Sequence, residues 1–85
     1  MSDAICLTGI PEECWRAAIA ALAADGWSLR KGGGLDFSRA VLERDGMNIK
    51  MEYDIWSDGE MVFASVDTPK IRAALPAHLL ADLPL

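Results

Sequence analysis

The sequence contains few of the side chains on which most catalytic and metal-binding sites depend. Of 85 residues, one is a histidine and two are cysteines. No serine or cysteine lies beside His78, so neither a Ser–His–Asp nor a Cys–His arrangement is indicated. Cys6 and Cys14 are too few for a disulfide framework and lack the spacing of metal ligands. We therefore predict a protein that is not an enzyme, with no catalytic residue, no metal site and no cofactor.

Long apolar runs and an excess of basic residues are also missing. No stretch approaches the roughly 18 apolar residues of a membrane-spanning helix, and residues 1–4 lack the basic start of a secretory signal. There are 8 basic residues against 13 acidic ones, which gives a net charge of −5. Binding to a phosphate backbone depends on Lys and Arg, and an anionic membrane surface repels a negatively charged protein. We expect a cytoplasmic protein that binds neither nucleic acid nor membranes.

The apolar residues that are present suffice for one small core. They make up 52% of the chain, with 25% charged residues, a balance typical of globular domains. A chain of this length buries only about 60% of the surface that its unfolded form exposes, so the core is thin. We predict a single domain over residues 1–85.

A helix is predicted over residues 11–24. Pro11 suits the first helical position, and Gly26 suits the residue that ends a helix. One apolar stripe recurs at helical spacing and is expected to lie on a sheet: Pro11, Trp15, Ala18, Ile19 and Leu22. The short apolar pattern over residues 4–8 leaves open whether a strand precedes this helix.

Four strands of an antiparallel meander are predicted after this helix, over residues 27–31, 37–44, 47–56 and 61–66. A second helix is predicted to begin at Thr68-Pro69 and to be interrupted at Pro76. The predicted fold is α+β: an N-terminal helix packed on a four-stranded antiparallel β-meander, followed by a short Pro-interrupted C-terminal helix. This order is similar to that of small secretion-chaperone-like and immunity-like proteins, a likeness of fold that does not determine function.

Two dipeptides, Asp45-Gly46 and Asp58-Gly59, are typical of two-residue hairpin turns, and such a turn sets the pairing of both its strands. Both turns place Met51 and Tyr53 on the same side of the sheet. The inner, helix-facing side is predicted to carry Ala40, Leu42, Ile49, Met51, Tyr53, Ile55, Val62, Ala64 and Val66.

The opposite side of the sheet is predicted to carry an aromatic patch at one end. The predicted protein interface consists of Phe37, Val41, Asp54, Trp56, Met61 and Phe63. Its predicted acidic rim consists of Glu43, Glu52, Asp58 and Glu60. Three occupants of this patch remain open: the C-terminal helix, a second copy or another protein, and a small ligand.

These observations predict a non-enzymatic protein-interaction module. It would form a homodimer or bind a protein partner through the patch, through the apolar C-terminal segment over residues 79–85, or through both. The alternative is an acidic inhibitor, of the immunity or anti-defence type, that blocks a basic enzyme acting on nucleic acid. The third possibility is a domain that binds a small ligand between helix and sheet.

Overall fold

The computed structural model describes residues 3–34 and 37–83. The elements in chain order are β1 (Ala4–Ile10), α1 (Glu12–Ala24), β2 (Ser28–Gly33), β3 (Phe37–Arg44), β4 (Met47–Asp54), β5 (Asp58–Ala64), the 3-10 turn η1 (Ser65–Asp67), α2 (Thr68–Ala74) and α3 (Ala77–Asp82). The α+β class is confirmed. Within the described ranges, none of the helices has both the length and the apolar character needed to cross a membrane.

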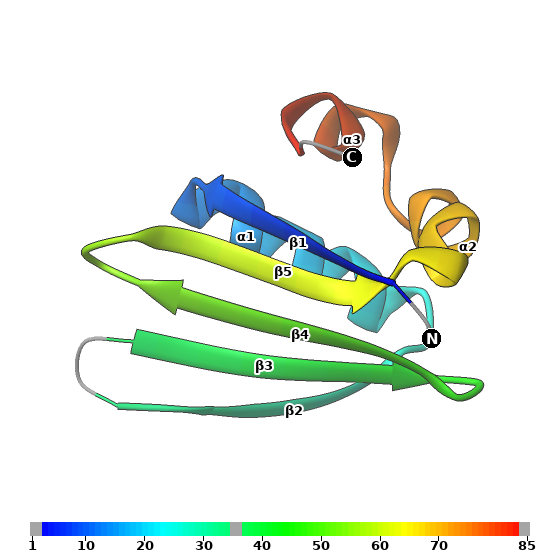
Figure 1. Cartoon of the computed structure of the whole chain (residues 1–85), viewed down its shortest axis with the longest axis horizontal. Helices are drawn as coiled ribbons and strands as arrows, with labels where there is room; N and C mark the ends of the chain where they lie inside the picture. Colours follow the sequence, from blue (N-terminus) through cyan, green and yellow to red (C-terminus); the bar gives the residue numbers. More distant parts are fainter. Residues whose placement is uncertain (1–2, 35–36, 84–85) are drawn as a thin grey trace.

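The strands form one antiparallel sheet of five strands in the order β1-β5-β4-β3-β2 (Figure 1). The prediction of four strands with a helix in first place was therefore wrong. The fifth strand, β1, precedes α1 and pairs with β5, so that Ala4 lies opposite Ala64 and Leu7 opposite Met61. Because β5, its partner, is so distant in the sequence, no local turn signal predicts the pairing of β1.

Helix α1 begins and ends where its local chemistry dictates. Pro11 precedes its first residue, and Gly26 follows it with φ +103, a left-handed conformation that glycine adopts without strain. The N–H of Gly26 donates to the carbonyl of Ala23 (3.2 Å), and the N–H of Trp27 donates to the carbonyl of Leu22 (3.1 Å). These two hydrogen bonds end the helix and direct the chain into β2.

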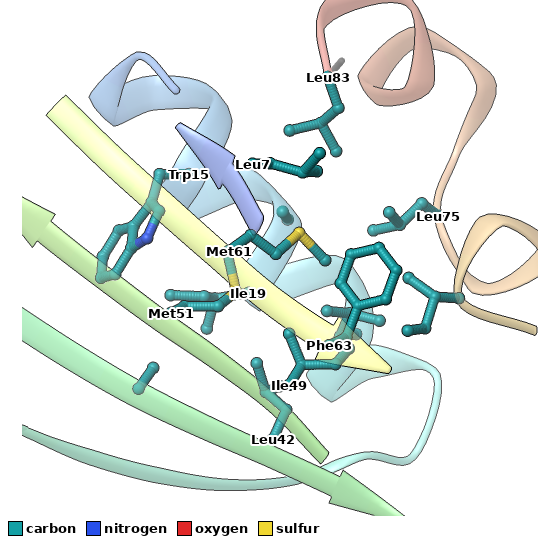
Figure 2. Close-up of a cluster of buried hydrophobic side chains, with 14 of the residues drawn as sticks. Leu7, Trp15, Ile19, Leu42, Ile49, Met51, Met61, Phe63, Leu75 and Leu83 are labelled. Carbon is teal, nitrogen blue, oxygen red and sulfur yellow. The ribbon is translucent and has the colours of Figure 1, made fainter. Parts of the chain in front are cut away.

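The predicted C-terminal helix is two separate helices, α2 and α3. Leu75 between them is extended, with ψ 139, because Pro76 disfavours helical geometry in the residue before it. Figure 2 shows Leu83 on the side of Leu7 and Leu75 on the side of Phe63, within the same core cluster. The C-terminal helices therefore add to the core on the side of α1, and they do not cover the opposite, outer face of the sheet.

One continuous core lies between the sheet and the helices. Four residues of the predicted α1 stripe are buried, Trp15, Ala18, Ile19 and Leu22, together with Cys14, whereas Pro11 is exposed. The C-terminal helices and the residues after them contribute Ile71, Leu75, Leu79 and Leu83. Much of the apolar C-terminal segment is thus used within the fold; Pro84 and Leu85 lie outside the described residues.

The Asp45-Gly46 turn has the predicted register. Asp45 and Gly46 both have positive φ (49 and 81), as a two-residue hairpin turn of this kind requires. All the predicted pairs of β3 with β4 are present, from Phe37 opposite Asp54 to Arg44 opposite Met47.

The register predicted from Asp58-Gly59 was wrong. The chain reverses instead through residues 55–57, and β4 pairs with β5 so that Met51 lies opposite Met61 and Tyr53 opposite Gly59. Relative to the prediction, β5 is displaced by an odd number of residues, which exchanges its two faces. Met61 and Phe63 therefore point into the core, with 0% and 2% of their surfaces exposed.

The same displacement changes four of the nine residues predicted for the inner face. Val62 and Ala64 lie on the outer face, and Ile55 lies in the turn with 58% of its surface exposed. Val66 lies in η1 and is 77% exposed. Ala40, Leu42, Ile49 and Met51 are buried as predicted, and Tyr53 is half-buried against the core.

Packing against Trp15 explains why Gly59 belongs to a strand and not to a turn. A Cβ atom at Gly59 would lie 2.6 Å from Cδ1 of Trp15 and 3.0 Å from the carbonyl oxygen of Ile10. Trp15 is 2% exposed, and its Nε1 donates to the carbonyl of Glu60 (3.3 Å). The indole ring thus occupies the space that a side chain at Gly59 would need.

Candidate protein-binding site

The end of the β4–β5 hairpin brings together six of the ten predicted site residues: Phe37, Glu52, Asp54, Trp56, Asp58 and Glu60. A shallow pocket of about 170 Å³ is lined there by Phe37, Glu52, Tyr53, Asp54, Ser57, Asp58 and Glu60. Four of these side chains carry carboxylates. We refer to Glu52, Asp54, Asp58 and Glu60 as the acidic corner.

The strand register sets the carboxylates of the acidic corner against one another. Glu52 lies directly opposite Glu60, and Asp54 lies directly opposite Asp58. Like charges in directly opposed positions destabilise a sheet, by roughly 0.2–1 kcal/mol for each pair. Arg39 approaches Glu52 to 3.7 Å between Nε and Oε1, but both side chains are more than half exposed, so this ion pair offsets little of the repulsion.

Apolar side chains stand exposed beside the acidic corner. Trp56 is 82% exposed, Ile55 58% and Phe37 41%. We refer to Ile55, Trp56 and Ser57 as the hairpin tip. An exposed tryptophan next to an exposed isoleucine adds nothing to the core, so its presence is not explained by folding.

Asp54 holds the hairpin tip in one shape. Its carboxylate accepts a hydrogen bond from the N–H of Trp56 (2.7 Å), and its carbonyl accepts one from the N–H of Ser57 (3.2 Å). Asp58 follows with φ +61, which completes the reversal. The backbone that carries the indole is therefore ordered in advance of any contact, which lowers the entropy lost on binding.

The remaining predicted site residues lie elsewhere. Met61 and Phe63 belong to the core, because the register of β5 places both side chains on the inner face of the sheet. Val41 is half-buried in the middle of the outer face. Glu43 lies farther along β3, where its carboxylate pairs with the guanidinium of Arg30.

Ile55 is the member of this surface that the sequence reasoning placed wrongly, in the core. The signal that could have placed it is Asp54, because an aspartate often opens a turn by accepting an N–H two residues later. Asp58-Gly59 concealed this signal because it is the stronger hairpin dipeptide.

The titratable groups near the core stay uncharged at neutral pH. Burial, and then the Glu12 carboxylate, raise the pKa of Tyr53, whose ring packs 5.7 Å from that of Trp15. Burial also raises the pKa of the Cys14 thiol, with a further contribution from Asp82. A protonated, buried thiol is a poor nucleophile, so Cys14 acts as a small apolar side chain.

The acidic corner lies in an open, shallow part of the surface. Among residues 3–34 and 37–83, no three His, Cys, Asp or Glu side chains are grouped in a way that could hold a metal. The pocket of about 170 Å³ is also smaller than the roughly 300–1,000 Å³ of typical small-molecule sites.

No family model, no curated protein and no solved structure matches this chain.

Proposed function

We propose that this domain is a non-enzymatic protein-interaction module that binds a basic surface of a partner protein through the acidic corner and the hairpin tip. One observation carries the proposal: two like-charged cross-strand pairs, Glu52–Glu60 and Asp54–Asp58, stand beside an exposed Trp56. The repulsion between these carboxylates costs stability in the isolated domain and would be relieved by cations from a partner.

The composition of this surface fits a binding hot spot. Tryptophan is the residue type most enriched among the side chains that dominate binding energy, and such anchors are usually surrounded by polar groups at the rim. Here Trp56 and Ile55 supply the apolar contact and the acidic corner supplies the charge. The carboxylates would speed association with a basic partner and make it sensitive to salt.

The same charges argue against a second copy of this chain as the occupant. In a symmetric dimer through this surface, the acidic corner would face or closely approach its own copy. Each chain also carries a net charge of −5. A basic protein avoids both sources of repulsion.

An acidic inhibitor of a basic, nucleic-acid-acting enzyme is a specific form of this proposal. The four carboxylates lie in two adjacent rows across β4 and β5, and a cleft that normally receives phosphates offers matching cations. Competition between this protein and DNA or RNA for the captured partner would distinguish this form from binding at another basic surface.

The test is affinity capture from the cell that makes the protein, with the partner identified by mass spectrometry. We expect the captured protein to be basic, to be released as salt is raised, and to be lost with Trp56→Ala. Val66→Ala is the matched control, because Val66 is 77% exposed but lies in η1, away from the hairpin tip.

Two outcomes would contradict the proposal. Partners held equally by wild type, Trp56→Ala and Val66→Ala would show that the hairpin tip is not the contact. A homodimer in solution that dissociates with Trp56→Asp would show that this surface binds a second copy instead.

A further inference from the structure

A second exposed surface lies on the helix-covered face of the sheet, along its β2 edge. Helix α1 packs on β3, β4 and β5, while β2 forms the sheet edge beyond them (Figure 1). A groove of about 400 Å³ opens between α1 and the two strands at this edge, β2 and β3. We call it the β2 groove; its apolar lining comes from Trp15, Ile19, Ala20, Ala23, Leu29 and Ala40.

The charge of the β2 groove is opposite to that of the acidic corner. Arg16, Lys31 and Arg39 line it, and none of the described residues that line it is acidic. The guanidinium of Arg39 lies on the outer face, opposite Glu52, so Arg16 and Lys31 supply the charge of the groove. The whole chain has 8 basic residues and a net charge of −5, so this concentration of cations departs from the average of the protein.

Among residues 3–34 and 37–83, two of these three cations have ion-pair partners and Lys31 has none. Arg16 pairs with Glu12 at 2.9 Å, and Arg39 pairs more distantly with Glu52. Lys31 makes no ion pair with any residue of the two described ranges. Its ammonium group is available to an acidic group from outside.

The strand beside the groove has one free edge. Since β2 pairs only with β3 in the described sheet, its other side presents main-chain N–H and C=O groups that can pair with a further strand. Leu29 and Lys31 lie opposite Leu42 and Ala40, so they share the groove side. Arg30 lies between them on the outer face.

We propose that the free edge of β2 binds an extended acidic segment of a partner protein as a sixth strand. Main-chain hydrogen bonds along β2 would supply affinity, and alternate side chains would supply specificity. On the groove side, an apolar side chain would pack beside Leu29 and a carboxylate would reach Lys31. On the outer side, a second carboxylate would compete with Glu43 for Arg30, whose side chain is 74% exposed.

The charges on β2 favour this occupant over a second copy of the chain. When two β2 strands pair antiparallel with full overlap, the central residues Arg30 and Lys31 meet each other or themselves across the two-fold axis. Cations would thus be directly opposed in each such register, which is unfavourable. An acidic strand in the same place gains an attractive contact at Lys31, and a second at Arg30 where its carboxylate displaces that of Glu43.

This inference is independent of the proposed function, because the two surfaces differ in position and in charge. A failure of either one leaves the other standing.

The probe is a short fluorescein-labelled peptide of alternating valine and glutamate, titrated with the whole chain at low salt. We expect saturable binding, with amide chemical-shift changes confined to residues 28–33 and the facing side of α1. Lys31→Glu should weaken binding by about tenfold or more. Lys70→Glu is the matched control, since Lys70 is exposed on α2, and it should leave the affinity unchanged.

A second pair of probes separates strand addition from simple charge attraction. The same peptide with every second amide N-methylated keeps its charge but loses the N–H donors of one of its two edges. There are two such peptides, one for each edge, and the one that is methylated on the edge facing β2 should bind at least about tenfold more weakly. Four results would overturn the proposal: no binding up to about 1 mM, equal binding of a lysine-for-glutamate peptide, no effect of either N-methylation pattern, or shift changes that avoid β2.

Discussion

Replacing Gly59 by alanine tests the packing that sets the register of the sheet. A Cβ at this position would lie 2.6 Å from Cδ1 of Trp15, whereas carbon atoms in favourable contact are about 3.5–4.0 Å apart. The indole would have to move by about 1 Å. It is held by the core around it and by its bond to the carbonyl of Glu60.

The magnitude follows from two opposing effects. Gly59 does not have positive φ, so alanine fits its backbone and would gain about 0.4–1 kcal/mol from the lower entropy of the unfolded chain. Overpacking of a core costs about 1–3 kcal/mol. We therefore expect Gly59→Ala to lower the free energy of unfolding by about 1–2 kcal/mol, measured by urea denaturation followed by circular dichroism.

Gly32→Ala is the control, because Gly32 is also a strand glycine without positive φ and an added Cβ there meets nothing within 4 Å. It should be neutral or slightly stabilising. In the background of Trp15→Leu, the cost of Gly59→Ala should shrink, since the ring is gone and only the carbonyl oxygen of Ile10, 3.0 Å from the added Cβ, remains close. Equal stabilities of Gly59→Ala and Gly32→Ala, or a cost that is undiminished without Trp15, would refute the placement of the indole on Gly59.

Three further predictions concern the core, the titratable groups and the acidic corner. Phe63→Ala should lower the free energy of unfolding by about 3–5 kcal/mol, and Trp56→Ala should lower it by less than about 0.5 kcal/mol. If Trp56→Ala were the more destabilising of the two, the register set by a two-residue Asp58-Gly59 turn would be correct instead. Folding raises the pKa of Cys14 above 9.0 and that of Tyr53 above 10.0, so the unfolded chain loses these protons first. Denaturation midpoints should therefore fall as the pH rises above about 9. Cys14→Ala combined with Tyr53→Phe should flatten that decline, and an unchanged slope would speak against the burial of both groups. Glu60→Gln should raise stability by about 0.2–1 kcal/mol in low salt and by less in high salt; a loss of stability would contradict the repulsion across β4 and β5.

The parts of the fold that could be predicted from the sequence are those that depend on neighbours in the chain. Helix α1 follows from Pro11, its apolar stripe and Gly26. The pairing of β3 with β4 follows from Asp45-Gly46, where both residues take the positive φ that the dipeptide favours. In each case the signal and the structure lie within a few residues of each other.

The parts that could not be predicted depend on contacts between distant residues. Asp58-Gly59 has the same local chemistry as Asp45-Gly46, but its glycine serves Trp15, 44 positions earlier in the sequence. The dipeptide itself does not show that the indole ring of Trp15 will pack on its glycine. The candidate site was predicted in part for the same reason: Phe37, Asp54 and Trp56 lie at the hairpin end in either register, whereas the positions of Met61 and Phe63 depend on the register of β5.

The pairing of β1 with β5 also has a consequence for how the chain reaches its native state. β1 is synthesised before the other strands, yet its partner is the last of them, so it waits unpaired while the rest of the sheet is made. Closing so long a loop carries an entropic cost before any contact repays it, which favours late docking of β1 onto a preformed meander. During that interval Ile5, Leu7 and Ile10 face water, and the incomplete sheet exposes β5 to any other chain that offers a strand.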